Sequence, residues 1–427
     1  MASQEFAKLP GFRDFPPEDF ARRAHIQGAW RRVARRYGFQ EYDGPPLESL
    51  DLYVEKSGEE IVGQLYNFVD KGDRAVALRP EMTPSLARIL AERSRGLSKP
   101  IRWFTMPQLF RYERAQRGRL REHFQWNVDI VGEAGVTADA EVVAVAIDGL
   151  RELGLTADDF AARVSDRRLL TALLRVLGVA EEKLGAAYSV IDKIERLPDE
   201  KADVLFTNEV GLSSAQITTL RTTLSSTSLD EVARDFGDNP DVAPELERLG
   251  EYVATLRSMG LGDFVQLDLR IVRGLAYYTG IVFELFDRKG ELRAICGGGR
   301  YDRLLELVGG DPLPAVGFGM GDVVLGELLA DRGLIPEYER TLDFYVIPVT
   351  AAERPTALKL AHDLRDRGHS VAYGLKEQGV GKQMKAASRE GARTVLVLGP
   401  DELAKGVVVV RDMGSGEQQE TPIGELG

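Results

Sequence analysis

The chain has 427 residues, of which 44% are hydrophobic, so it can bury more than one core and two or three domains are expected. Its net charge of -12 excludes a general nucleic-acid coat protein, although a local basic patch can still bind RNA. A single cysteine, Cys296, excludes an intrachain disulfide and a cysteine-rich zinc site, which fits a reducing cytoplasm. No apolar stretch has the length of a signal-peptide core or a membrane span, so we expect a soluble protein without membrane contact.

The N-terminal third begins with a helix over 16–36, where two prolines open the helix and apolar residues recur at helical spacing. A strand and a proline-stiffened bend follow in FQEYDGPPLESL. Residues 65–85 predict two strands around a KGD turn, ending in LRPEMTP. Thr83 in this segment is as well placed to cap the next helix as to bind a ligand.

A long basic hairpin is predicted over 109–129. The segments on both sides of the turn have the apolar and β-branched residues of strands. Five arginines surround Gly118 at the turn: Arg111, Arg114, Arg117, Arg119 and Arg121. Guanidinium groups suit polyphosphate because each can donate two parallel hydrogen bonds to phosphate oxygens. A solvated edge hairpin is the alternative, but Gln125 and Asp129 are separated by an even number of residues and so face the same side of the sheet, as in a substrate pocket.

The hairpin sequence FRYERAQRGRLRE resembles motif 2 of class II aminoacyl-tRNA synthetases in the form found in histidyl-tRNA synthetases. FQEYDGPPLESL then resembles motif 1, with Pro45 at the family's proline, which implies a homodimer. The resemblance assigns Glu81 and Thr83 to the α-amino group of histidine. An ammonium needs two or three oxygen acceptors, which Glu81, Thr83 and Gln125 can supply.

After the hairpin, Thr137 is a plausible cap for a helix that stops at Gly154. The segment that follows, up to about 261, consists of helical pieces broken by Gly, Pro and Ser, with few strand signals. It predicts a helical insertion, at the position where histidyl enzymes carry one, and suggests no chemistry.

Residues 265–286 predict two strands and contain RGLAYYTG, which is similar to the histidine signature RGLDYYTG of the family. The resemblance makes Arg273 the catalytic arginine and places Tyr277 and Tyr278 in the histidine pocket. Ala276 replaces the family's aspartate. Without the resemblance, a strand with one arginine and two tyrosines would more often belong to the hydrophobic core and its edge than to a binding site.

Two glycine-rich stretches follow. CGGGRYD, beginning at Cys296, resembles a second histidine signature, and we expect its glycines to open a helix and make room for an adenylate, with tight packing as the alternative. AVGFGMGDVVLGELL, beginning at Ala315, resembles motif 3, in which a helix arginine holds the γ-phosphate of ATP. Val324 occupies that position. If the chain is a ligase, another arginine must replace it, with Arg119 as the best candidate and Arg117, Arg121 and Arg303 as further ones. The alternative is that Val324 packs the helix against the sheet and ATP is not bound there.

The segment over 341–427 alternates strands and helices, which predicts a small, mostly parallel sheet covered by helices. It resembles the anticodon-binding domain of class II synthetases. Three of its lysines are plausible phosphate contacts: Lys376, Lys382 and Lys385. Lysines that are simply solvated at the surface are the more common alternative.

Together the resemblances imply an α+β protein with a class II antiparallel sheet and flanking helices, divided into a catalytic core (1–164 and 262–333), a helical insertion (165–261) and an anticodon-binding-like α/β domain (341–427). They imply a cytoplasmic, homodimeric histidine–tRNA ligase that uses ATP with Mg²⁺, L-histidine and tRNA(His). Arg111 and Arg273 would be catalytic, Asp129 and Tyr278 would contact the imidazole, and Glu113 would join Arg111 and Arg119 at ATP. Since Ala276 and Val324 depart from the family, one alternative is a histidine-binding regulatory subunit of the ATP phosphoribosyltransferase type, although such subunits usually lack the terminal domain. A tRNA-binding or amino-acid-sensing module without ligase activity is the other alternative.

Overall fold

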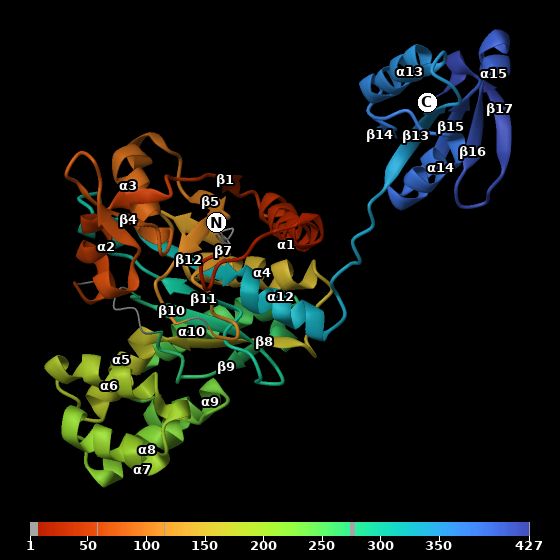
Figure 1. The fold of residues 1–427 in the computed structure, drawn as a ribbon. Helices are drawn as coiled ribbons and strands as arrows, with labels where there is room; N and C mark the ends of the chain where they lie inside the picture. The colour runs from red at the N-terminus through yellow and green to blue at the C-terminus, as the bar shows by residue number, and fades with distance from the viewer. Residues whose placement is uncertain (1–6, 58, 115, 274–277, 427) are drawn as a thin grey trace. The chain divides into compact units, whose positions relative to one another are not determined.

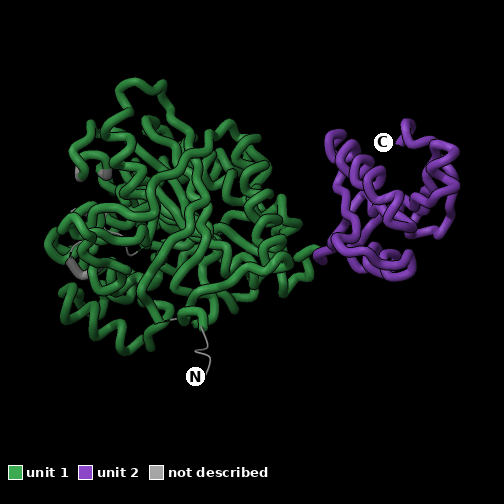
Figure 2. Tube along the Cα trace, turned by 45° about the horizontal axis from the view of Figure 1, so that its top comes forward, with its two compact units in different colours: residues 1–336 green, residues 337–427 purple. Residues whose placement is uncertain are grey.

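The computed structural model describes residues 7–57, 59–114, 116–273 and 278–426. The chain forms two compact units, Met1–Pro336 and Glu337–Gly427 (Figure 2). Each unit has its own sheet and its own hydrophobic core. Among the described residues, no helix is both long and apolar enough to cross a membrane.

The first unit is built on a nine-stranded sheet with strand order β1-β5-β7-β12-β11-β10-β8-β9, in which β6 pairs with β7 beside this path (Figure 1). Its strands are β1 (Gln40–Glu41), β5 (Ile101–Thr105), β6 (Gln108–Phe110), β7 (Glu122–Val131), β8 (Phe160–Asp166), β9 (Val265–Leu267), β10 (Ile281–Asp287), β11 (Cys296–Arg300) and β12 (Ala315–Gly321). The central pairings are antiparallel, and the outer pairs β1–β5 and β8–β9 are parallel. A separate small sheet has the order β2 (Leu47–Ser49), β4 (Ala75–Leu78), β3 (Asn67–Val69).

Helices flank the main sheet, and the predicted α+β class is confirmed. Among the described residues of this unit, the α-helices outside the insertion are α1 (Pro17–Arg36), α2 (Leu50–Ser57), α3 (Thr83–Arg93), α4 (Val136–Arg151), α11 (Leu304–Leu307) and α12 (Asp322–Asp331). On one face, Trp126 of β7 stacks on Trp30 of α1 with ring centroids 5.8 Å apart, and Phe318 of β12 meets Trp126 edge-on at 5.2 Å. Because side chains alternate along a strand, the odd-numbered neighbours of Trp126 on β7 face the other side of the sheet.

Three local predictions were wrong. Thr83 is the first residue of α3 and lies past the cap position, which Met82 occupies without a side-chain hydrogen bond. Thr137 lies inside the first turn of α4, whose cap is Gly135. The glycine run at Cys296 does not open a helix, because it forms β11, hydrogen-bonded to β10 on one side and β12 on the other.

Helices occupy the chain between β8 and β9, as the sequence predicts. They are α5 (Arg167–Val176), α6 (Leu184–Ile191), α7 (Asp199–Leu205), α8 (Ser214–Leu224), α9 (Leu229–Phe236) and α10 (Ala243–Ser258). Asp166, the last residue of β8, caps α5 by accepting hydrogen bonds from the backbone N–H groups of Arg168 and Leu169. Burial raises the pKa of Asp166 to about 6, although Arg248 of α10 pairs with this carboxylate at 2.5 Å.

The second unit has a five-stranded sheet with order β14-β13-β15-β16-β17. Its elements are β13 (Leu342–Pro348), α13 (Arg354–Asp366), β14 (Val371–Tyr373), α14 (Val380–Arg389), β15 (Ala392–Leu398), α15 (Pro400–Lys405), β16 (Val407–Asp412) and β17 (Gln418–Pro422). The first three strands are parallel, but β16 and β17 are antiparallel, so the expectation of a mostly parallel sheet was wrong for the last two. The links before β16 and β17 are too short for the crossover of a dozen or more residues that parallel strands need.

Candidate active site

A small pocket on the main sheet gathers most of the residues predicted from the sequence. Its volume is about 80 Å³, and seven predicted residues line it: Glu81, Thr83, Arg111, Gln125, Asp129, Arg273 and Tyr278. Tyr277 lies outside the described residues. Glu113 and Arg119 do not line the pocket, because they lie on the basic hairpin and pair with each other.

Glycines on β11 and β12 form the floor of this pocket. In the strand register, Gly317 of β12 lies between Asp129 of β7 and Gly299 of β11, and Gly319 lies between Asn127 and Gly297. A Cβ atom at Gly317 would lie 2.1 Å from Oδ1 of Asp129, and one at Gly297 would lie 1.7 Å from Nη1 of Arg273. The glycines therefore make room for polar side chains that extend across the sheet from neighbouring segments.

Arg273 reaches the pocket from the connection between β9 and β10. Its backbone has a φ of 53°, a left-handed conformation that costs a non-glycine residue on the order of 1–3 kcal/mol. Its Nη1 donates to Glu284 of β10 at 2.6 Å, and its guanidinium carbon lies 5.7 Å from the centre of the Tyr278 ring. A strained backbone that aims a guanidinium into a pocket indicates a functional role for that side chain.

The basic hairpin forms as predicted, between β6 and β7. Arg111 lies at its base, where the backbone N–H bonds to the carbonyl of Arg121 and Nε donates to the carbonyl of Pro80 at 3.1 Å. Gly118 occupies the turn with a φ of 70°, which glycine adopts without strain. The hairpin therefore fixes Arg111 beside the pocket.

The hairpin tip contacts α12, although Arg114, Gln116 and Arg117 at the tip are exposed. The backbone N–H of Gly118 donates to Glu327 at 3.0 Å, and Arg117 pairs with the same carboxylate at 3.3 Å. Val324, one turn before Glu327, is buried, and a Cβ atom built on Gly118 would lie 3.4 Å from its methyl group. The position where the family has its motif 3 arginine is thus covered by the hairpin tip.

Positive charge converges at the hairpin end of the pocket. Burial, together with the nearby guanidiniums of Arg111, Arg13 and Arg119, lowers the pKa of His123 to about 3. Arg13, which the sequence did not single out, is neutralised by Glu122 at 2.6 Å and Asp322 at 2.9 Å. Arg119 is paired with Glu113, whereas Arg111 donates to a backbone carbonyl, so Arg111 makes this end of the pocket suitable for an anion.

Three further polar residues belong to the site and were missed from the sequence. The hydroxyl of Tyr301 donates to Asp129, Glu284 holds Arg273, and Asn127 lines the pocket between Gln125 and Asp129. The even spacing that selected Gln125 and Asp129 also includes Asn127, so that residue was within reach of sequence reasoning. The other two depend on contacts between distant segments.

Comparisons with known proteins agree with this geometry. A histidyl-tRNA synthetase model matches residues 11–321, and an anticodon binding domain model matches residues 343–427. The chain belongs to the histidyl-tRNA synthetase family. It is 45% identical to the histidine–tRNA ligase of Opitutus terrae, with 98% of this chain and 96% of the relative covered. It is 44% identical to the chloroplastic/mitochondrial histidine–tRNA ligase of Arabidopsis thaliana, with 97% and 85% covered.

The fold is also that of the family. The crystal structure of histidyl-tRNA synthetase from Nostoc sp. PCC 7120 superposes with a TM-score of 0.82 and 26% identity, over 98% of this chain and 97% of that one. The predicted class II architecture is therefore confirmed. Because curated ligases match along nearly the whole chain, the regulatory-subunit alternative is not favoured.

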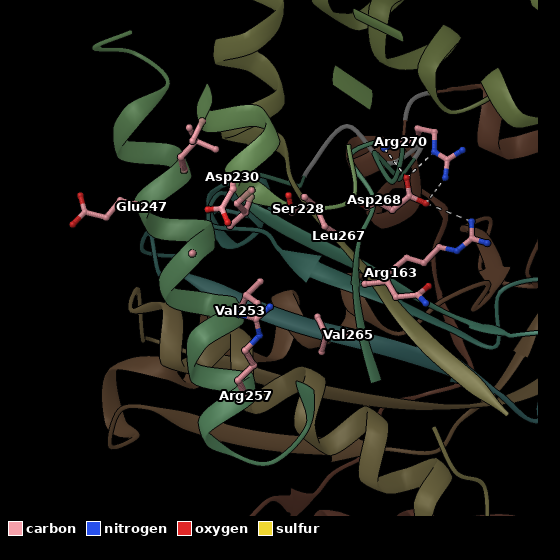
Figure 3. Close-up of a pocket in the computed structure, with 16 residues that line it drawn as sticks. Arg163, Ser228, Asp230, Glu247, Val253, Arg257, Val265, Leu267, Asp268 and Arg270 are labelled. Carbon is pink, nitrogen blue, oxygen red and sulfur yellow. Dashed lines mark hydrogen bonds and ion pairs between the residues drawn. The ribbon is translucent and has the colours of Figure 1, made fainter. Parts of the chain in front are cut away.

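A larger groove, of about 810 Å³, lies between α9, α10 and the edge strand β9 (Figure 3). None of the described residues that line it is among those predicted from the sequence. Its Asp268 pairs with both Arg163 and Arg270, at 3.5 and 2.8 Å, so these charges are satisfied within the protein. We do not assign the reaction to this groove.

Proposed function

We propose that the chain joins L-histidine to tRNA(His) at the pocket on β7, β11 and β12, in two steps with ATP. The chain is a histidine–tRNA ligase, and the observation that carries this conclusion is its similarity to curated ligases over nearly its full length. The pocket supports it, because it brings together acidic and amide side chains (Glu81, Gln125, Asp129) and two guanidiniums (Arg111 and Arg273).

In the first step, a carboxylate oxygen of histidine attacks the α-phosphorus of ATP. The bond from that phosphorus to the bridging oxygen breaks, and pyrophosphate leaves. Arg111 and Arg273 hold the carboxylate and the α-phosphate and neutralise the charge that develops in the in-line transition state. Both guanidiniums are positioned before substrate binds, Arg111 by the Pro80 carbonyl and Arg273 by Glu284.

The histidine side chain and amino group are recognised at the other end of the pocket. Glu81, Thr83 and Gln125 accept hydrogen bonds from the α-ammonium. Asp129 and Tyr278 complement the two ring nitrogens, one as acceptor and one as donor, and Tyr277 is expected to join them. Tyr301 fixes the Asp129 carboxylate by donating to it.

ATP binds at the hairpin, where Arg119 contacts the terminal phosphates and Glu113 lies at the hairpin base. Among the described residues there is no cluster of three or more His, Cys, Asp or Glu side chains suited to a metal ion. Mg²⁺ fits this site as a partner of the phosphates, since it takes many of its ligands from phosphate and water oxygens and bridges the charges of ATP. Glu113 would be available to hold Mg²⁺ if Arg119 turned from this carboxylate to the phosphates.

In the second step, a hydroxyl of the terminal ribose of tRNA attacks the histidyl carbonyl and AMP leaves. The second unit binds the anticodon, and Lys376, Lys382 and Lys385, all exposed, are its phosphate contacts. We assign 1–164 and 262–333 to the catalytic core, 165–261 to the helical insertion and 341–427 to the anticodon-binding domain. The protein acts as a cytoplasmic homodimer.

ATP–pyrophosphate exchange on the purified full-length protein tests this function. Exchange should require Mg²⁺ and L-histidine and should not occur with other amino acids, and histidine should then be transferred to tRNA(His). Binding of histidine without any exchange would reject the ligase and would instead indicate a regulatory protein.

A further inference from the structure

The helical insertion joins the main sheet beside the residues that are proposed to contact the imidazole. Its first helix, α5, begins where β8 ends, and β8 pairs with β10, whose first residue Ile281 lies opposite Asp166. The backbone N–H of Arg167 donates to the carbonyl of Gly280 at 3.0 Å. The first turn of the insertion is therefore attached to the segment that carries Tyr278 into the pocket.

Arg168, in the same turn of α5, contacts two separate segments at once. Its Nε donates to the carbonyl of Thr279 at 2.9 Å, and its Nη2 pairs with the carboxylate of Asp302 at 3.3 Å. The hydroxyl of Thr279 also donates to Asp302, at 2.8 Å, which closes the network. Because a guanidinium presents its donors in a rigid fork, these contacts fix the two segments relative to each other.

Each contact of Arg168 lies one residue from a side chain at the proposed imidazole end of the pocket. Thr279 directly follows Tyr278 in the chain. Asp302 directly follows Tyr301, whose hydroxyl donates to the β7 carboxylate that is proposed to bind the ring. Arg168 is not among the described residues that line the pocket, so it can affect histidine only through the position of these neighbours.

Helix α5 gives no local reason for an arginine at position 168. Positive charge is favourable in the last turn of a helix, where Arg175 lies, and unfavourable in the first turn, because the N-terminal end of the helix dipole is itself positive. The Arg168 side chain is 45% exposed, yet two interactions hold it against the sheet. The reason for this residue therefore lies in what it holds.

We propose that Arg168 is a positioning residue through which the helical insertion keeps the histidine-binding side chains in place. It fixes Thr279 and Asp302 relative to each other and thereby sets the separation of the two tyrosines that precede them. The inference rests on the proposed function, because it takes L-histidine as the ligand of those tyrosines. It gives the insertion, which suggested no chemistry from its sequence, a part in binding the amino acid.

Pyrophosphate exchange by the full-length protein, measured against histidine and ATP in turn, tests the proposal. Arg168→Met removes the guanidinium at similar length, and Arg168→Lys keeps a charge that reaches one of the two partners at a time. Arg175→Met makes the same chemical change on the same helix and serves as the matched control, because the Arg175 side chain is 53% exposed and pairs with Glu181 inside the insertion.

Arg168→Met should raise the KM for histidine roughly three- to tenfold, as expected for the loss of a hydrogen bond, and should leave the KM for ATP and kcat at saturating histidine nearly unchanged. Arg168→Lys should recover part of the loss, and Arg175→Met should behave as the wild type. Arg168→Met combined with Asp302→Asn should raise the histidine KM by less than the product of the two single effects, because both changes break the same contact.

A purely structural role would give a different result. If Arg168 only attached the insertion to the sheet, Arg168→Met would lower the midpoint of thermal unfolding while the histidine KM stayed at the wild-type value, and this outcome would overturn the proposal. An equal rise in the KM for ATP, or independent effects of Arg168→Met and Asp302→Asn, would also overturn it.

Failure of the proposed function would be seen in the wild type. If the wild type binds histidine in a calorimetric titration but does not catalyse exchange, the ligase assignment is wrong, and the histidine affinities of the same variants then decide the role of Arg168. If the wild type binds no histidine, both proposals are wrong.

Discussion

Gly319→Ala gives a direct test of the glycine floor. A Cβ atom at this position would lie 2.7 to 2.9 Å from the three terminal atoms of the Gln125 amide, and these are its nearest neighbours. Since all of them belong to the end of one flexible side chain, the methyl group should push the amide aside and leave the sheet intact. The equivalent change at Gly317 is less informative, because there the backbone carbonyl of Val128 lies 2.7 Å away and the strands themselves would have to move.

The expected loss of histidine affinity follows from the hydrogen bond that Gln125 is proposed to accept from the α-ammonium. A hydrogen bond to a charged group contributes about 1.5–3 kcal/mol, which corresponds to roughly a 10- to 150-fold rise in the histidine concentration required. The requirement for ATP should change little, because ATP is proposed to bind at the hairpin end. Pyrophosphate exchange measured against each substrate in turn separates the two effects.

Gly326→Ala is the matched control. Gly326 lies within α12, where the nearest atom to a new Cβ is Cδ1 of Ile26 at 4.0 Å, so alanine should be neutral or should stabilise the helix. The double variant Gly319→Ala, Gln125→Ala should lose no more than Gln125→Ala alone, because both changes remove the same contact. If Gly319→Ala left the histidine requirement unchanged, or raised the ATP requirement equally, the proposed placement of the amino acid would be wrong.

Three other outcomes are expected. Arg273→Ala should slow adenylate formation on the order of a hundredfold or more with a much smaller change in histidine affinity, and an unchanged single-turnover rate would remove its catalytic role. Arg119→Ala should weaken binding of ATP with Mg²⁺ by about 1.5–3 kcal/mol in a calorimetric titration, and equal affinity would mean that another cation binds the phosphates. His123 should remain neutral in an NMR titration down to pH 4, because burial and the neighbouring guanidiniums lower its pKa to about 3, whereas ATP should raise that pKa. Since the unfolded chain protonates this histidine near pH 6.5, the same shift should reduce stability as the pH falls from about 6.5 to 3.

The elements with local signals could be predicted from the sequence. The helix that begins at Pro17, the hairpin around Gly118 and the same-face pair Gln125 and Asp129 follow from periodicity and turn chemistry. The two cap predictions failed because Thr83 and Thr137 each lie one or two residues inside the helix, a boundary error that sequence patterns rarely resolve.

Features that depend on pairing between distant strands could not be predicted. Nothing near Gly317 in the chain indicates that its missing side chain leaves space for Asp129, and nothing near Tyr301 indicates that its hydroxyl reaches the same carboxylate. The register of β7 with β12 and of β12 with β11 determines both the space beside Gly317 and the contact between Tyr301 and Asp129. The glycines make room for the protein's own side chains, which agrees with the alternative of tight packing. The expectation that they also make room for an adenylate stays a prediction.

The loss of the motif 3 arginine changes how the phosphate end must work. Val324 lies under Gly118, and the hairpin tip is held there by Glu327, so an arginine at position 324 would have to displace the tip. Arg13 cannot replace the missing charge while Glu122 and Asp322 neutralise it. Arg119 can supply the missing charge, because its side chain is 40% exposed and its partner Glu113 belongs to the same hairpin. Phosphate can thus replace a carboxylate as the partner of Arg119 while the hairpin stays in place, and in this chain the γ-phosphate charge is most simply met from the hairpin.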